Sequence, residues 1–334
     1  RVLEERRRRQ LWFMLALMPE LEVLLAAVAR MDSSTLGPES VELLVLNLPT
    51  AEEASLLRQA AEVPLQEEEV WDTPEDFVLR VTDIPEYELR VKVWSFLNSF
   101  DPICTKLKAA AEDVATACGV LRNSERIQQL LALVLYVGNY LNGGTPRGRA
   151  DGFDVETLPK LSAVKTSVAL RREGNRSGAN LLDFLVRQME REYPGVLQHL
   201  YEAGNEVEWV HRARRHKLAE VGQELARLLA QAQDYHRRLK QHVPAADPLV
   251  GCMGETHACI VRLNDLSSSL EEVHLKYQSL GLWFHMDVQK LRPTDEFFAL
   301  WDGFFLDLKR ALDAAARPPA RAGPGARSTT PRLR

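Results

Sequence analysis

The sequence predicts an all-α fold, because apolar residues recur with the helical period almost throughout and convincing alternation of apolar and polar residues is absent. Glycine and proline fall mostly between the apolar runs, where they end helices. Two segments, 218–239 and 263–280, also carry apolar residues at heptad spacing. The chain has 334 residues, 46% hydrophobic and 27% charged, which is enough apolar material for one large elongated domain or two compact ones.

The helices of the first hundred residues are predicted from caps and breakers. We expect the first helix at 19–31, with its proline at an early helical position. Segment 37–60 predicts two short helices separated at Pro49, the second capped by Thr50 with acidic residues in its first turn. The same arrangement predicts a further helix capped by Thr73, with a proline at its first position.

Heptads are the clearest periodic signal in the second half of the chain. Steps of three and four residues connect two sets of apolar positions, Leu218, Val221, Leu225, Leu228, Ala232, Tyr235 and Leu239, then Leu263, Leu266, Leu270, Val273, Tyr277 and Leu280. Charged and amide side chains occupy the outer positions, and segment 242–255 can reverse the chain, so an antiparallel coiled coil is expected. An ordinary amphipathic hairpin in a compact bundle is the alternative.

Composition and charge exclude several classes of protein. The formal net charge is −5, so we expect no general attraction to nucleic acid or to an anionic membrane. Four cysteines are too few for a disulfide scaffold and are expected to be reduced core thiols. The basic start and apolar run at 1–18 resemble a signal peptide, but acidic residues follow, and the run is too short to cross a bilayer. We expect no targeting signal and no membrane span.

The sequence lacks the motifs by which most enzymes are identified. It contains no nucleophile elbow, paired-carboxylate motif or phosphate-loop lysine. His211 and His216 are five residues apart, so they do not share the helix face that metal ligands use. Cys252, His257 and Cys259 lack a fourth ligand at suitable spacing. We therefore expect a protein that is not an enzyme and that uses no cofactor and no metal.

The most informative segment is 138–153, GNYLNGGTPRGRADGF, which follows a strongly apolar run typical of a buried helix. Gly138 has no Cβ and lets another chain approach the helix closely. Asn139 and Asn142 lie on one helix face, where they can hydrogen-bond to a neighbouring loop or chain. The two glycines after them permit positive φ at the helix exit, and Phe153 is expected to anchor the loop to the core. The segment forms either a receptor for an inserted chain or a braced turn without a partner.

The stretch GNYLNGGTPRGRADGFDVETLPKLSAVKTS, followed by NLLDFLV, closely resembles the signature of the formin homology-2 domain, the actin-assembly domain of formins. That family carries Gly-Asn-Tyr-Met-Asn, a glycine-rich loop with Arg-Gly and Gly-Phe, and a Leu-x-x-Leu-x-Lys-Leu run. Here Leu141 replaces the usual Met at similar volume, and VALRREGNRSG lengthens the loop after Lys165. The stretches VLEERRRRQLWFMLAL, LPTAEEASLLRQ and PTDEFFALWDGFFLDLKRAL also resemble parts of that domain.

The resemblance extends from about Val2 to Ala316 and implies the organisation of the chain. Residues 1–316 would form an elongated multi-helix, all-α formin homology-2 fold with knob, coiled-coil bridge and post regions. The tail at 317–334, which is basic, rich in proline and glycine and without an apolar period, is expected to be disordered.

The resemblance also implies a function and two sets of site residues. The chain would be a cytoplasmic, cytoskeletal actin-binding protein that nucleates filaments and associates with barbed ends. The knob residue that enters a cleft on actin maps onto Phe13, with Trp12 as its neighbour if the register shifts. The post lysine that contacts actin maps onto Lys165, and Arg147 and Arg149 make the post locally basic.

A second surface would join two subunits. In the family a partner's N-terminal lasso docks on the post, and here the matching residues are Gly138, Asn139, Tyr140, Asn142, Gly143, Gly144, Gly152 and Phe153. By the resemblance the given chain would begin at the knob, and we expect its domain to lack most of the lasso and linker. We expect a homodimer in the full-length protein, a monomer for the given chain, and profilin binding only through a proline-rich segment not present here. The alternative function is a formin-fold helical scaffold that has lost actin nucleation and serves in protein–protein interaction.

Overall fold

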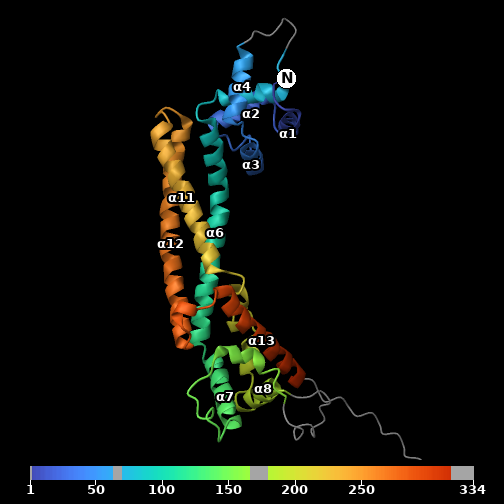
Figure 1. Ribbon diagram of the computed structural model, residues 1–334, viewed down its shortest axis with the longest axis vertical. Helices are drawn as coiled ribbons and strands as arrows, with labels where there is room; N and C mark the ends of the chain where they lie inside the picture. The colour runs from blue at the N-terminus through green and yellow to red at the C-terminus, as the bar shows by residue number, and fades with distance from the viewer. Residues whose placement is uncertain (1, 63–69, 166–179, 317–334) are drawn as a thin grey trace, which may run out of the picture. The chain divides into compact units, whose positions relative to one another are not determined.

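The computed structural model describes residues 2–62, 70–165 and 180–316 (Figure 1). It contains two compact units, unit 1 with Arg1–Ala109 and Gly222–Ser269, and unit 2 with Ala110–Val221 and Leu270–Arg334. Within the described ranges every regular element is a helix, and the β-structure there is one isolated bridge between Lys165 and Asn180. The predicted all-α class is therefore confirmed. The tail at 317–334 and most of the lengthened loop after Lys165 lie outside the described residues.

Unit 1 starts with five helices, α1 (Glu5–Ala16), α2 (Leu21–Arg30), α3 (Pro38–Leu46), α4 (Ala51–Ala61) and α5 (Thr73–Thr82). Their buried side chains form one hydrophobic cluster, which includes Leu11, Leu24, Val41, Leu57 and Phe77. The basic run at the start of the chain contributes to this fold. Arg8 is buried and forms ion pairs with Glu5, Asp72 and Glu75, and Arg7 pairs with Glu53 at 2.8 Å.

The helix caps confirm one prediction and correct two others. The Thr50 hydroxyl accepts a bond from the Glu53 backbone at 3.1 Å, and the Glu53 carboxylate accepts one from the Thr50 backbone at 2.9 Å. The cap of α5 is Asp72 rather than Thr73, because the Asp72 carboxylate accepts from the Thr73 backbone at 3.0 Å. The helix expected at 19–31 is α2, and it is not the first, because the basic run folds as α1. Pro19 was expected at an early helical position but precedes the N-cap residue Glu20, so it lies outside the helix.

Three long helices contribute residues to both units, α6 (Tyr87–Asn123), α11 (Leu218–His242) and α12 (Cys252–Trp283). The heptad residues predicted in α11 and α12 are all buried. In unit 1 the ring centroids of Phe96 and Tyr235 are 5.5 Å apart, and Arg262 pairs with Asp101 at 2.6 Å. There α11 and α12 pack with α6 as a third helix, and the turn between them includes the short 3₁₀ helix η3 (Pro248–Gly251).

Unit 2 contains the remaining elements, α7 (Glu125–Leu141), η1 (Val155–Lys160), α8 (Leu181–Glu192), α9 (Val196–His199), α10 (Glu206–Ala213), η4 (Val288–Lys290) and α13 (Thr294–Ala316). Helix α13 packs against α8, α10 and η1. Its inward face is strongly aromatic and includes Phe297, Phe298, Trp301, Phe304 and Phe305. Because each ring buries a large area, α13 supplies much of the hydrophobic stabilisation of unit 2.

Two buried carboxylates fix the junction between α10 and α11. Asp302 of α13 accepts from His211 at 3.0 Å and from Arg214 at 2.7 Å. Asp113 of α6 accepts from His216 at 3.1 Å. These histidines therefore serve as partners of carboxylates, and within the described ranges no group of three His, Cys, Asp or Glu side chains could hold a metal ion.

The four cysteines are free and buried, as predicted, at positions 104, 118, 252 and 259. Among the residues that the structure describes, no single helix is long and apolar enough to cross a membrane. By length and composition, α1 and α2 reach that threshold only as a pair, and the chain bends by 82° between them.

Candidate functional site

Helix α7 presents two different faces. Ser124 caps its N-terminus by accepting a bond from the Ile127 backbone at 3.3 Å. The inward face, Ile127, Leu130, Val134 and Val137, is buried. Tyr136 and Tyr140 are four residues apart, so they lie on one face, and they are 71% and 79% exposed. Because so much aromatic surface is in contact with water, this face is a candidate for docking another chain.

The loop after α7 is braced from within. The Asn139 amide donates to the Ala150 carbonyl at 2.8 Å, and its oxygen accepts from the Ala150 backbone at 2.7 Å. The Asn142 amide donates to the Gly138 carbonyl at 2.8 Å, back into the last turn of the helix. A Cβ added to Gly148 would lie 2.6 Å from the Asn142 carbonyl oxygen, so the chain crosses itself closely here. Both asparagines therefore bond within the segment.

The outer side of the same segment is open. A Cβ added to Gly138 or Gly152 would meet nothing within 4 Å. Of the two glycines expected to adopt positive φ, only Gly144 does so, at 79°, whereas Gly143 donates its backbone N–H to Tyr140. Leu141 is exposed, and Phe153 is only partly buried. The turn is thus braced from within and also leaves a free surface on its outer side.

The predicted knob residue lies on α1 with its ring in solvent. Phe13 is 65% exposed, and its ring meets that of Trp12 edge to face with centroids 5.8 Å apart. Leu17, at the end of the same helix, is also exposed. These three residues form an apolar group on the surface of unit 1, and we call it the α1 apolar group. The ring of Phe13 is thus not part of the unit 1 core.

The predicted basic residues of the post are all exposed. Lys165 pairs through its backbone with Asn180, directly before α8. Arg147 and Arg149 lie in the loop after α7, where Arg149 has a φ of 63°. Beyond these three, the basic side chain in the described segment 142–165 is Lys160.

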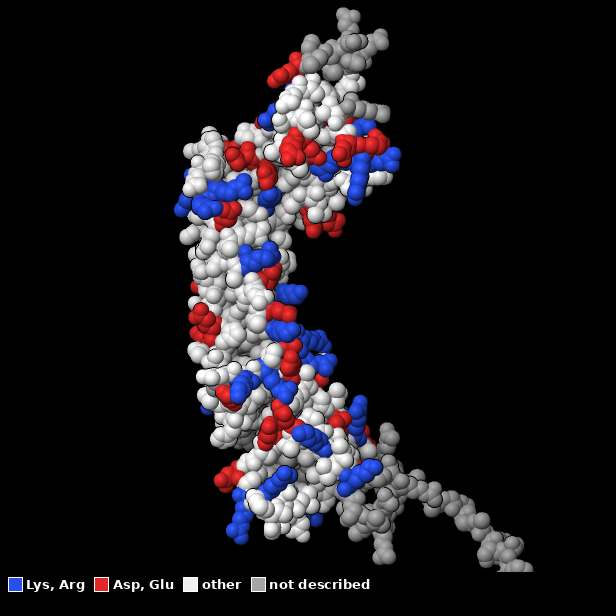
Figure 2. Space-filling model, in the orientation of Figure 1, with Lys and Arg blue, Asp and Glu red and all other residues white. Residues whose placement is uncertain are grey.

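The described segment 142–165 carries a smaller excess of positive charge than the whole loop 142–176. In the described segment 142–165, four cations stand against three carboxylates, and one of these, Glu156, is paired with Arg292. Three further arginines of this loop, at 171, 172 and 176, lie outside the described residues. On the face drawn in Figure 2, Lys and Arg alternate with Asp and Glu, so neither sign dominates. An acidic partner would therefore be attracted by the places of the individual cations and not by a net positive charge of the region.

Tyr136 and Gly148 were missed by sequence reasoning. The four-residue spacing of Tyr136 and Tyr140, together with the apolar positions between them, would have placed both tyrosines on the face opposite the core. The need for glycine at 148 has no signal in the sequence, because it arises from a contact between two turns of one loop.

The fold and these surfaces define an all-α domain whose candidate site suits contact with other protein chains. The chain belongs to the formin homology 2 domain family, whose model matches residues 1–309. Formin-C of Dictyostelium discoideum is 28% identical over 302 residues, which cover 88% of this chain and 24% of that protein. Disheveled-associated activator of morphogenesis 2 of Mus musculus is 27% identical over 300 residues, which cover 87% and 25%. Formin-1 of Homo sapiens is 31% identical over 176 residues, which cover 52% and 12%. The chain thus spans a quarter or less of the length of these relatives.

Proposed function

We propose that the chain is an actin-binding domain that nucleates filaments and associates with their barbed ends, in the cytoplasm and with the cytoskeleton. Membership of the formin homology 2 family supports actin as the partner. The observation that carries the proposal is the α1 apolar group of Trp12, Phe13 and Leu17, which is exposed although it is large and apolar. Such groups at a protein surface mark interaction sites.

The knob contact depends on the transfer of Phe13 from water into a cleft on actin. Burial of a phenylalanine side chain contributes about 1.5–3 kcal/mol, and Trp12 adjoins it, so the pair can act as an anchor. The helix that carries the pair is held to the unit 1 core by Leu11, Met14 and the buried Arg8. The anchor is therefore presented on a supported element, which lowers the entropic cost of binding.

The post contact is electrostatic. Lys165, Arg147 and Arg149 are exposed cations that can meet acidic side chains of actin. Contacts of this kind give modest affinity each and mainly orient the partner and raise its association rate. We therefore assign affinity chiefly to the knob and orientation chiefly to the post.

Dimerisation would convert binding into nucleation. The open face of α7 at Gly138, Tyr140 and Leu141 is proposed to receive the lasso of a second subunit, and Asn139 and Asn142 brace that receptor from within. Two linked subunits hold two actins at high effective concentration, which removes much of the entropic cost of forming a filament nucleus.

The test is actin assembly followed by pyrene fluorescence, together with co-sedimentation with filaments. The full-length protein should shorten the lag before assembly and bind filament ends at substoichiometric amounts. Filament binding without a shortened lag would favour the alternative, a helical scaffold of the formin fold that has lost nucleation. Absence of both effects would remove actin from the function of this chain.

A further inference from the structure

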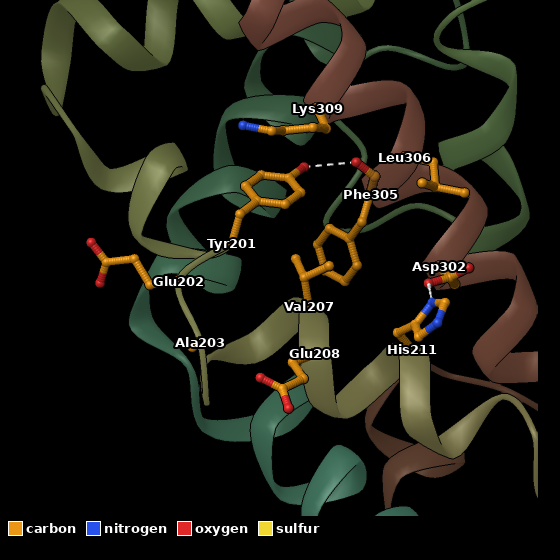
Figure 3. A pocket seen from close by; sticks show the side chains of 10 residues that line it. All are labelled: Tyr201, Glu202, Ala203, Val207, Glu208, His211, Asp302, Phe305, Leu306 and Lys309. Atoms are coloured by element: carbon orange, nitrogen blue, oxygen red, sulfur yellow. Dashed lines mark hydrogen bonds and ion pairs between the residues drawn. The ribbon is translucent and has the colours of Figure 1, made fainter.

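A hollow of about 260 Å³ lies in unit 2 (Figure 3). None of the residues that line it belongs to α7 or adjoins Lys165 in the sequence. Its walls come from α13 and from the segment that joins α9 to α10 and continues into α10. Neither the knob nor the post contact uses these residues.

The floor of the hollow is apolar and held in place. Figure 3 shows the Tyr201 ring beside Phe305, with Val207 below them and Leu306 further along α13. The Tyr201 hydroxyl donates to the Phe305 carbonyl at 2.7 Å, which fixes the ring. Leu306 is 51% exposed, so part of the floor faces water. A fixed aromatic ring beside an exposed leucine is the kind of surface on which proline-rich segments dock.

The rim of the hollow is acidic. Glu202 and Glu208 are exposed. The Glu202 carboxylate contacts the His199 ring at 2.8 Å, and the Glu208 carboxylate accepts from the Gly204 backbone at 2.7 Å, whereas within the described ranges neither pairs with Lys or Arg. The cation on the rim, Lys309, lies over the Tyr201 ring and is neutralised by Asp313 at 3.1 Å. The two glutamates therefore give the rim a negative charge that a basic ligand would match.

A segment with matching chemistry follows α13 directly. Residues 317–334 contain five arginines, four prolines and no acidic residue. We propose that this C-terminal segment binds in the hollow of its own chain, with a proline against Tyr201 and Leu306 and arginines beside Glu202 and Glu208. The contact is independent of actin and of the proposed function.

The distances allow this contact. The last residue of the hollow, Lys309, is seven positions before the end of α13 at Ala316, which is about 10 Å along a helix. A proline-rich chain extends about 3.1 Å per residue, so about four residues are enough to return along α13. Pro324 and the arginines on either side of it are then within reach of the hollow. Because the segment is tethered, even a weak contact is favoured by a high effective concentration.

Photo-crosslinking of the whole chain tests the proposal. Benzoylphenylalanine is placed at position 325 in place of Gly325, and crosslinked residues are mapped by mass spectrometry after illumination. We expect crosslinks within 201–208 and 302–309. The double substitution Glu202→Lys and Glu208→Lys should lower their yield about threefold to tenfold, as expected for the loss of two exposed ion pairs.

Matched variants separate a specific contact from general charge attraction. Glu271→Lys with Glu272→Lys makes the same charge change at two exposed positions of α12 and should leave the yield unchanged. Leu306→Ser should lower the yield although it changes no charge. Crosslinks scattered over the surface, or equal losses in both double variants, would overturn the proposal. A yield that rises with protein concentration would also overturn it and would assign the contact to a second copy.

Discussion

At the scale of single residues, two glycines of one segment differ in what surrounds them. A Cβ at Gly138 would meet nothing, whereas a Cβ at Gly148 would lie 2.6 Å from the Asn142 carbonyl oxygen. We expect Gly148→Ala to lower the free energy of unfolding by about 1–3 kcal/mol, because the loop must shift away. Gly138→Ala, in the last turn of α7, should be neutral or stabilise by about 0.5–1 kcal/mol. Urea unfolding of both variants measures these free energies of unfolding. Equal values for the two variants would contradict the close approach of Gly148 to the Asn142 carbonyl.

Phe13 should matter for binding and little for stability. Because its ring is 65% exposed, Phe13→Ala should shift the midpoint of thermal unfolding only slightly. If the ring is the anchor for actin, the same change should weaken barbed-end binding by about 2–4 kcal/mol. Leu56→Ala on α4, which also removes an exposed apolar side chain of unit 1, is the control. Normal barbed-end affinity in the Phe13 variant would exclude the anchor role.

At the scale of elements, the joint between α7 and α10 depends on one carboxylate. Glu206 is 6% exposed and accepts from the Ser124 hydroxyl at 2.6 Å and from Arg126 at 3.0 Å. Burial alone would raise the pKa of Glu206, but the bonds from Ser124, from its own backbone N–H and from Arg126 outweigh it and hold the pKa below the ordinary 4.5. The charged form is thus the one that the folded state favours.

The sign of the pH dependence follows from that lowered pKa. The contribution of Glu206 is present above pH 4.5 and is lost as the pH falls through the folded-state pKa, since the unfolded chain then binds the proton more readily. We expect the free energy of unfolding to fall on acidification below pH 4.5, and Glu206→Gln should flatten this part of the profile. Glu271→Gln, at an exposed position, is the control. Parallel profiles for the normal and Glu206→Gln chains would show that Glu206 does not carry this dependence.

The elements differ in how far the sequence predicts them. The capping box at Thr50 and the heptads of α11 and α12 were predictable, because both are local spacing patterns. Helix α6 continues past Pro102, where a local rule predicts a break. The buried Phe100 and Cys104 on either side indicate that tertiary packing outweighs the cost of the lost backbone bond. The helix α1 was not expected either, because its arginines depend on carboxylates from other elements, such as Glu53 and Asp72.

At the scale of the whole molecule, the order of motifs along the sequence was enough to identify the family. The exposure and hydrogen bonds of the candidate site residues could be learned only from the fold. The predicted site residues were found from their position in a long ordered signature. Whether their side chains face water or the interior could not be predicted in this way. Asn139 illustrates the point, because its partner Ala150 is eleven residues away and no local pattern specifies that bond.

The electrostatic part of the proposed function predicts a charge effect on assembly. Lys165→Asp should slow actin assembly about threefold to tenfold, because an attractive contact becomes repulsive. The circular dichroism spectrum should not change, since the side chain is exposed. Lys276→Asp on α12, also exposed, should have no effect. The difference between the two variants should shrink as salt rises, because screening shortens the range of the charge. Equal assembly rates at low salt would remove Lys165 from the contact.

The reactivity of the buried thiols can report how often the helices around them separate. Burial raises the pKa of Cys118 to about 12 and that of Cys252 and Cys259 to about 11, so in the closed state almost no reactive thiolate exists at neutral pH. An alkylating reagent should therefore react much faster with a thiol when the surrounding helices separate than in the closed state. Cys252 and Cys259 belong to unit 1 and Cys118 to unit 2. The alkylation rates at these positions would thus time the opening of each unit separately, without any substitution in the chain.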